Sequence, residues 1–238
     1  MQHLGHTRSS WKGSHAFLTP DTFVRAALPG MTNATAIVHA APAMGARFTE
    51  YTVEFEPNGA MTPTDEQRFV YVLDGEVHIG DRRLSKDHYA YLPPGEPLGI
   101  STTGPAKAIV IEKPYIPLAA KPTALFGNER ELAPHPLMGD DALGVRTMIP
   151  AEPAYDMAVN TMTFEPGSSL PMVEIHVMEH GLLMLDGGGI YRLDENWYPA
   201  SAGDFIWMGP YCPQWFGAIG KTPARYLIYK DWNRHPLA

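Results

Sequence analysis

The chain has 238 residues, a formal charge of −8 and 45% hydrophobic residues, which predicts an ordinary globular protein with material for one large core or two smaller ones. The acidic balance excludes non-specific nucleic-acid binding, which requires a basic face. One cysteine excludes an internal disulfide, and no apolar run approaches the roughly 18 residues of a membrane helix. The N-terminal sequence shows no apolar segment of signal-peptide type, so we expect a cytoplasmic protein.

Short apolar runs between glycines and prolines fill the first half of the chain, a pattern typical of an all-β protein. Residues 1–30 read as a polar N-terminal arm with one edge strand at His15–Leu18. Residues 31–113 are predicted to form an N-terminal barrel. Its strands are expected at 35–40, 46–55, 69–73, 76–79, 87–92 and 108–113. The Asp74-Gly75 pair between two of these runs predicts a hairpin.

The second half of the chain repeats this plan roughly 110 residues later. The run that ends at Asp74-Gly75 corresponds to the run 182–185, which ends at Asp186-Gly187. A repeat of this length is a duplicated domain, which predicts two tandem jelly-roll barrels. The second barrel spans residues 137–238, and a Pro- and Ala-rich linker spans 114–136. Only residues 128–132 have a helical pattern, for at most one turn.

The stretch between Gly167 and Gly187 contains the pattern Glu-x-His-x3-His, formed by Glu174, His176 and His180. Residues two apart on a strand point to the same face, so Glu174 and His176 are expected to face one side of a strand. His180 stands at the start of the next apolar run. A carboxylate and two imidazoles on one side of a small barrel supply three ligands for a first-row divalent metal.

This pattern resembles the two sequence motifs of cupin barrels. Gly167 and Gly187 frame the first motif, with Glu174 at the position of the first histidine. In the second motif, which begins at Gly203, Gln214 falls at the position of the histidine ligand. The resemblance implies one cation in the C-terminal barrel, held by four side chains: Glu174, His176, His180 and Gln214.

The same positions in the first half hold Thr62, Thr64, Arg68 and Leu98. Two hydroxyls, a cation and an apolar side chain do not form a ligand set for a divalent ion, and Arg68 adds a like charge. We therefore expect the N-terminal barrel to hold no metal.

The Glu/His/His/Gln set narrows the resemblance from cupins in general to one cupin family. Together with Tyr191, Asn-Trp-Tyr-Pro at 196–199 and Tyr-Lys-Asp at 229–231, it resembles the (S)-ureidoglycine aminohydrolases, a bicupin family of purine catabolism. The resemblance implies that the four ligands bind Mn2+ and that the protein releases ammonia from (S)-ureidoglycine to give (S)-ureidoglycolate. It also implies substrate contacts for Tyr191 and Lys230. With Glu174 as the proton carrier, these residues form the expected catalytic group.

Two alternatives stay open. One is another metal bicupin, such as an oxalate decarboxylase or a dioxygenase, which usually presents three histidines and a glutamate. The other is a non-enzymatic cupin that binds a small ligand. Carboxylate and imidazole ligands suit Fe2+ as well as Mn2+. We expect a small-molecule substrate, no nucleic-acid or membrane partner, and a homo-oligomer in which the N-terminal arm lends an edge strand to a neighbour.

Overall fold

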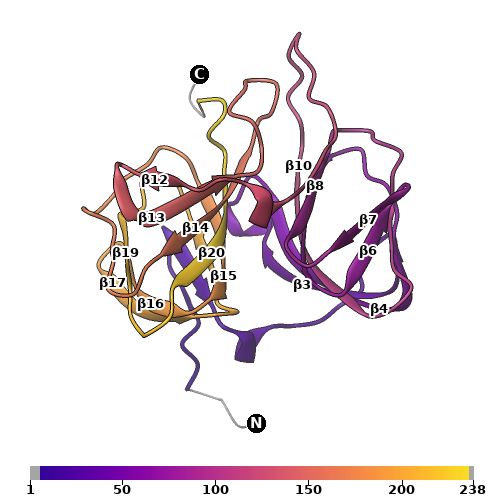
Figure 1. Ribbon diagram of the computed structural model, residues 1–238. Coiled ribbons are helices and arrows are strands. Elements are labelled where there is room, and N and C mark those ends of the chain that lie inside the picture. Colours follow the sequence, from indigo (N-terminus) through magenta and orange to yellow (C-terminus); the bar gives the residue numbers. More distant parts are fainter. Residues whose placement is uncertain (1–5, 236–238) are drawn as a thin grey trace. The chain divides into compact units, whose positions relative to one another are not determined.

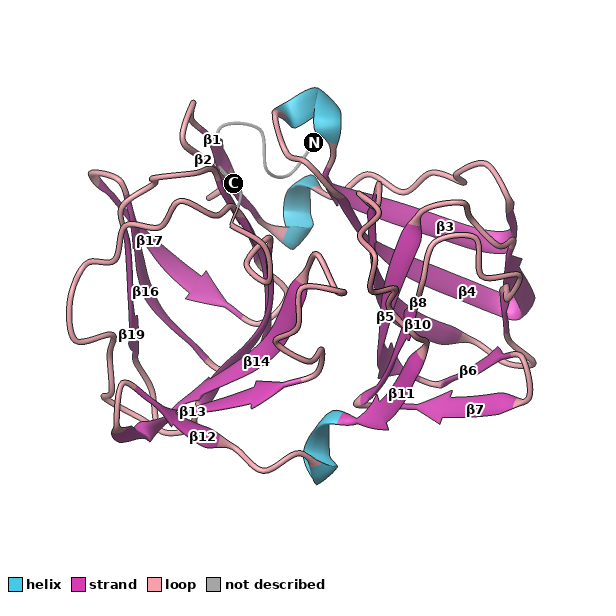
Figure 2. Ribbon diagram, turned by 90° about the horizontal axis from the view of Figure 1, so that it is seen from above, coloured by secondary structure: helices cyan, strands magenta, loops and turns pink. Residues whose placement is uncertain are grey.

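The computed structural model describes residues 6–235, so the first five residues of the expected arm and the last three of the expected C-terminal barrel lie outside the described residues. The chain divides into two compact units (Figure 1). The N-terminal unit comprises residues 24–131 and 153–155, and the C-terminal unit comprises residues 1–23, 132–152 and 156–238. Strands and loops make up nearly all of both units (Figure 2). The all-β prediction is confirmed.

The described part of the chain contains three helices, all single 3-10 turns: η1 (Pro20–Thr22), η2 (Pro42–Met44) and η3 (Glu129–Glu131). The last of these falls where the sequence predicts at most one helical turn. Within residues 6–235, no helix is long and apolar enough to span a membrane.

The N-terminal unit is a sheet that curls around its own apolar core. In this sheet β11, β8, β5, β10 and β4 are neighbours in that order, with β3 also on β4 and with β9, β6 and β7 continuing from the far end of β4. The strands are β3 (Met31–Ala40), β4 (Thr49–Met61), β5 (Gln67–Asp74), β6 (Glu76–Ile79), β7 (Arg82–Ser85), β8 (His88–Leu92), β9 (Ile100–Ser101), β10 (Ala106–Lys113) and β11 (Leu125–Asn128).

The C-terminal unit has two sheets. One has the order β1-β2-β18-β15-β20-β14-β13-β12 and the other the order β17-β16-β19. The strands are β1 (Ser10–Trp11), β2 (His15–Leu18), β12 (His135–Leu137), β13 (Asp140–Thr147), β14 (Ala158–Phe164), β15 (His180–Asp186), β16 (Gly188–Leu193), β17 (Asn196–Ser201), β18 (Phe205–Met208), β19 (Gln214–Ala218) and β20 (Ala224–Lys230).

The strand pairing shows that the two units are copies of one plan. In the N-terminal unit β8, β5, β10 and β4 follow one another, and in the C-terminal unit β18, β15, β20 and β14 do so in the same order. Gly75 and Gly187 occupy equivalent corners with φ of +71° and +66°. A Cβ atom at either glycine would lie 2.4 or 2.5 Å from a backbone carbonyl oxygen, that of Pro105 or Pro223. Both corners therefore require glycine, and the predicted duplication is confirmed.

The hairpin predicted at Asp74-Gly75 is wrong. Strand β5 pairs with β10 and β8, whereas β6 pairs with β7 and β9. The chain changes direction at Gly75, as an Asp-Gly pair suggests, but it crosses to a different set of strands and does not fold back on β5. Close packing of Gly75 against the Pro105 carbonyl directs this crossing.

Two segments expected to be arm and linker supply edge strands. β2 pairs antiparallel with β18, and β11, inside the expected linker, pairs antiparallel with β8. These are equivalent edges of the two units, and an unpaired edge exposes backbone donors and acceptors. The arm therefore covers an edge of its own chain, where we expected it to lend a strand to a neighbour. The Arg8 guanidinium fixes this arm by two hydrogen bonds to the Asp204 carboxylate, at 2.7 and 2.9 Å.

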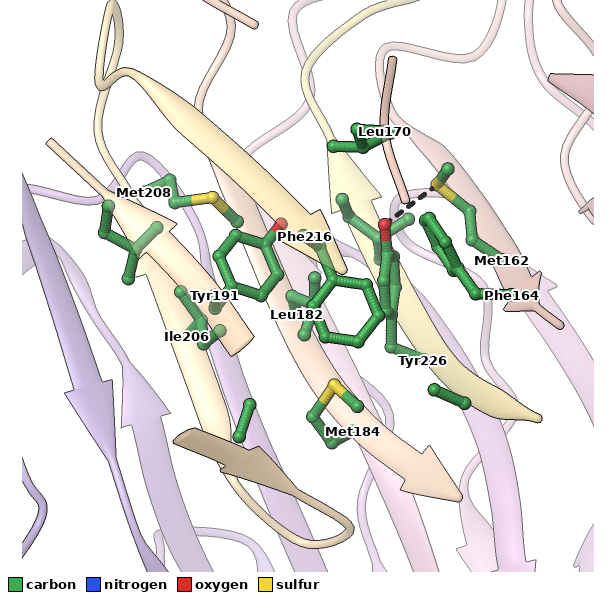
Figure 3. Close-up of a cluster of buried hydrophobic side chains, with 14 of the residues drawn as sticks. Met162, Phe164, Leu170, Leu182, Met184, Tyr191, Ile206, Met208, Phe216 and Tyr226 are labelled. Carbon is green, nitrogen blue, oxygen red and sulfur yellow. Dashed lines mark hydrogen bonds between the residues drawn. The ribbon is translucent and has the colours of Figure 1, made fainter. Parts of the chain in front are cut away.

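The core of the C-terminal unit is rich in aromatic rings and methionines (Figure 3). Phe216 lies edge-on to Phe164, with ring centroids 5.0 Å apart, and packs against Tyr191 at 5.3 Å. The phenol oxygens of Tyr191 and Tyr226 point toward the same side of this cluster. The core thus presents two hydroxyl groups at one end of an otherwise apolar interior.

Candidate metal centre and active site

A two-residue backbone bridge joins Glu174 to Gln214. The Glu174 amide donates to the Gln214 carbonyl at 2.8 Å, and the Gln214 amide donates to the Glu174 carbonyl at 2.9 Å. Residues that exchange both hydrogen bonds in an antiparallel pair carry their side chains on the same face. Two predicted ligands that are 40 positions apart in the sequence are therefore neighbours.

Glu174 and His176 do not lie on a strand, contrary to the prediction. Glu174 forms only the isolated bridge, and His176 follows in irregular chain. Their side chains nevertheless meet, with His176 Nε2 3.1 Å from Glu174 Oε2. The His176 carbonyl accepts a hydrogen bond from the Tyr211 amide at 2.6 Å, which holds this loop close to the start of β19.

His180 is the first residue of β15, as the sequence predicts, and its ring centroid lies 5.4 Å from that of His176. His180 Nδ1 lies 2.8 Å from the Glu179 carbonyl oxygen. Because a carbonyl only accepts, Nδ1 carries the proton and the lone pair is on Nε2. Burial, with the charge of Lys230, lowers the His180 pKa well below its usual value, so the ring is a neutral donor of that lone pair.

Tyr191 contributes its hydroxyl to the same site. This hydroxyl lies 3.4 Å from Gln214 Oε1, the amide oxygen predicted to be a ligand. Burial and then the charge of Glu174 raise the Tyr191 pKa, so the phenol stays protonated and donates.

Tyr226, on β20, is a site residue that the sequence analysis missed. Burial raises the pKa of Tyr226, and the neighbouring Tyr191 and Glu174 raise it further. The Tyr226 hydroxyl therefore lies in the same site as these two residues. This hydroxyl lies 3.4 Å from Met162 Sδ (Figure 3). Tyr226 stands four residues before Lys230 on one strand and thus on the same face, which is the signal that could have identified it.

Lys230 ends β20 and pairs in register with both His180 and Ala158. Burial lowers the Lys230 pKa, and the Glu174 carboxylate opposes this effect by raising it. Glu174 therefore acts electrostatically on both of the other residues of the predicted catalytic group, Tyr191 and Lys230.

Asn160 is a second residue that the sequence analysis missed. It lies on β14, two residues before the core residue Met162 and therefore on the same inward face. Its side-chain oxygen is buried and has no hydrogen-bond partner among the described residues. A buried acceptor without a partner is energetically costly in a closed core. This indicates that a bound group donates a hydrogen bond to the Asn160 oxygen.

The donor types at this site suit a divalent first-row ion: one carboxylate, two imidazoles and one amide oxygen. The side chains meet in pairs, Glu174 with His176 and His176 with His180. Within residues 6–235, no group of three or more His, Cys, Asp or Glu side chains stands close enough to hold a metal ion as they lie. Convergence of all four predicted ligands on one cation stays a prediction.

Comparisons with known proteins point to one family. The Cupin domain family matches residues 160–229. An (S)-ureidoglycine aminohydrolase of Arabidopsis thaliana is 39% identical over 98% of this chain and 80% of its own length. One from Escherichia coli K12 is 33% identical over 93% of this chain and 90% of its own length. The crystal structure of E. coli protein Ylba covers 98% of this chain and 97% of its own, with 31% identity and a TM-score of 0.85.

Proposed function

This chain belongs to the family of the (S)-ureidoglycine aminohydrolases, and we propose that it is an enzyme that hydrolyses a C–N bond of (S)-ureidoglycine. The resemblance drawn from the ligand pattern is thereby confirmed. In the proposed reaction, water adds its oxygen to the carbon that loses the amine, the C–N bond breaks, and ammonia and (S)-ureidoglycolate leave. The observation that carries the proposal is similarity to relatives of this one activity over nearly the whole chain.

The C-terminal barrel would hold the cofactor, proposed to be Mn2+, through the four predicted ligands: Glu174, His176, His180 and Gln214. Bound there, the ion supplies Lewis acidity and lowers the pKa of bound water. His180 is prepared for this role because the Glu179 carbonyl fixes its tautomer. Gln214 is oriented by its backbone bridge to Glu174 and by the Tyr191 hydroxyl.

Three side chains from three elements contact the substrate in this proposal. The Lys230 ammonium pairs with the substrate carboxylate, and the Tyr191 hydroxyl donates to the ureido oxygen. The Glu174 carboxylate takes a proton from the attacking water and returns it to the leaving amine. Because these groups contact three different substituents of one carbon, their arrangement selects one hand of the substrate.

Tyr226 acts as a positioning residue, and Asn160 adds a fourth substrate contact to the three above. The Tyr226 phenol interacts electrostatically with Tyr191 and Glu174, and it stays neutral because burial raises its pKa. The Asn160 oxygen is an acceptor on the neighbouring strand that lacks a partner among residues 6–235. A substrate amine or ureido N–H would donate a hydrogen bond to this oxygen.

The experiment that tests the proposal is incubation of purified protein with freshly generated (S)-ureidoglycine while ammonia is followed against the spontaneous rate. Wild-type protein is expected to accelerate ammonia release, and Lys230→Met is expected to lose most of the acceleration through a raised KM. Decarboxylation of oxalate without ammonia release would favour the oxalate decarboxylase alternative. A protein that binds no divalent metal and whose Tm does not rise with Mn2+ would support a non-enzymatic cupin.

A further inference from the structure

The N-terminal unit contains a cavity of about 240 Å3 at the positions that match the metal centre of the other unit. Three of the four positions found there by motif counting line this cavity, namely Thr62, Thr64 and Arg68. Leu98 does not line it and packs against the apolar core. The duplicated barrel therefore keeps an interior space where the ligand set has been replaced.

The pairing register shows how exact the equivalence is. Arg68 pairs with Glu112 between β5 and β10, as His180 pairs with Lys230 between β15 and β20. Arg68 thus stands where the predicted ligand His180 stands in the C-terminal unit. Glu112 stands where the predicted substrate-binding Lys230 stands.

Arg68 is only 4% exposed, and polar contacts hold its guanidinium in place. Its Nε and Nη2 atoms lie 2.7 and 2.6 Å from Glu112 Oε1, and its Nη1 donates to the Thr62 carbonyl at 3.0 Å. A guanidinium has five N–H donors and a carboxylate has about four acceptor sites, so both groups keep capacity for a ligand. Arg68, which is buried, and Glu112, which is partly exposed, present donors and acceptors side by side.

Close contacts between Gly30 and Thr62 shape one side of the cavity rim. Gly30 has φ of +81°, and a Cβ there would lie 2.3 Å from Thr62 Oγ1. The Thr62 amide donates to the Gly30 carbonyl at 3.0 Å. Met31 and Met61 add an apolar wall. The space is thus preformed, with polar groups at one place and apolar groups around them, as small-molecule sites usually are.

We propose that the N-terminal barrel binds, without a metal, a small uncharged molecule that carries a ureido or primary amide group. Such a group offers a carbonyl to the Arg68 guanidinium and an N–H to the Glu112 carboxylate at the same time. The charges of Arg68 and Glu112 cancel, and burial and then the Glu112 carboxylate raise the pKa of nearby Glu66, so the surroundings already disfavour negative charge and an anionic ligand is disfavoured. The volume is below the roughly 300 Å3 at which drug-sized sites begin, which limits the ligand to a small compound.

The test uses the full chain and a matched pair of probes, neutral N-carbamoylglycinamide and anionic N-carbamoylglycine. Binding is followed by NMR of methionine 13C-methyl groups, because Met31 and Met61 line this cavity whereas Met162 and Met208 lie in the core of the other unit. We expect saturable shifts of Met31 and Met61 with the neutral probe, and at least about tenfold weaker binding of the anion.

Variants separate a ligand site from a structural ion pair. Thr64→Val removes a hydroxyl from the lining and is expected to weaken binding about tenfold, and the double variant Arg68→Met/Glu112→Met is expected to abolish it. Arg25→Met changes the same charge at an exposed ion pair with Glu54 and is the control, with unchanged affinity. Absence of Met31 and Met61 shifts up to the solubility limit of the probe would overturn the proposal. So would shifts confined to Met162 and Met208, tighter binding of the anion, or full affinity in both cavity variants. The outcome is independent of ammonia release.

Discussion

Two polar side chains of the C-terminal site, His180 and Gln214, have a neighbour that determines which of their atoms faces the interior. The Glu179 carbonyl binds one nitrogen of His180, and the Tyr191 hydroxyl meets the amide oxygen of Gln214. The bridge to Gln214 fixes the backbone of Glu174, so the Glu174 side chain starts from a defined position. Such support is what keeps a catalytic group within reach of a productive geometry.

Replacing the Glu174 carboxylate tests its proposed role as proton carrier. Glu174→Gln keeps the backbone bridge and the side-chain volume but removes the base. We expect kcat for ammonia release to fall by about 100-fold or more, with little change in Tm. Glu195→Gln, at an exposed position of the same unit, is the control. Undiminished kcat in Glu174→Gln would remove this residue from the mechanism.

Tyr226 provides a test of a residue recognised only in the structure. Tyr226→Phe removes a hydroxyl that makes a weak contact to Met162 Sδ and also interacts with the Tyr191 hydroxyl, so the free energy of unfolding should change by about 1 kcal/mol or less. We expect kcat/KM to fall about tenfold. Tyr89→Phe, in the other unit, is the matched control and should keep full activity. Equal kcat/KM in both variants would show that Tyr226 is only a core residue.

The resemblance to the cupin motifs predicted the residues that stand at fixed spacings. Glu174, His176 and Gln214 were found by counting from glycines, because turn positions in this fold are set by backbone geometry. Tyr226 and Asn160 were missed because a tyrosine or an asparagine inside a strand is usually structural, and only the four-residue spacing from Lys230 singles out Tyr226. Their role depends on which strands are neighbours, which the sequence does not state.

At the scale of elements, edge strands from distant parts of the chain complete both sheets. β2 covers β18, and β11 covers β8. The run His15–Leu18 was predicted as an edge strand within the N-terminal arm. The edge strand Leu125–Asn128 was not predicted, because the surrounding prolines and alanines interrupt the alternation of apolar and polar residues on which strand prediction depends. β16 and β17 were missed for a similar reason, since glycines open one and a proline interrupts the other.

Removing Arg8 tests how firmly the N-terminal arm is held. The Asp204 side chain is 1% exposed, so Arg8→Ala would leave a buried carboxylate without its cation. We expect the free energy of unfolding to fall by about 1–3 kcal/mol in urea titrations. Arg82→Ala, an exposed arginine, should change it by less than about 0.5 kcal/mol. Equal stability of the two variants would show that the arm is dispensable.

At the scale of the molecule, the repeat was the most informative feature of the sequence. Two halves with the same order of apolar runs and turns predicted two barrels, and the pairing order confirms them. Counting across the repeat also grouped Thr62, Thr64 and Arg68 with Leu98; the first three line one cavity, and Leu98 does not. The direction of the chain after Asp74-Gly75 was not predictable, because the same dipeptide serves hairpins and crossings alike.

Glu50 on β4 makes the stability of the whole molecule depend on pH. Its carboxyl oxygens are buried without a hydrogen-bond partner among residues 6–235, and burial raises its pKa to about 8 from 4.5. Between these two values the folded chain holds a proton that the unfolded chain releases, so stability falls as pH rises from about 4.5 to 8.

Urea unfolding at pH 6 and pH 8 measures this effect. We expect wild-type protein to lose more stability than Glu50→Gln over this interval, with at most about 1.4 kcal/mol per pH unit from this group. Glu76→Gln, in the same unit at a partly exposed position, is the control and should follow the wild type. Equal slopes in wild type and Glu50→Gln would show that Glu50 does not titrate in this range.

The most direct test of the account is the rate of ammonia release from (S)-ureidoglycine as a function of Mn2+ bound per chain, in protein first stripped with a chelator. We predict that the rate rises in proportion to bound metal and reaches its maximum at one ion per chain, held in the C-terminal barrel. Full activity in metal-free protein, or a maximum reached only at two ions per chain, would contradict the account.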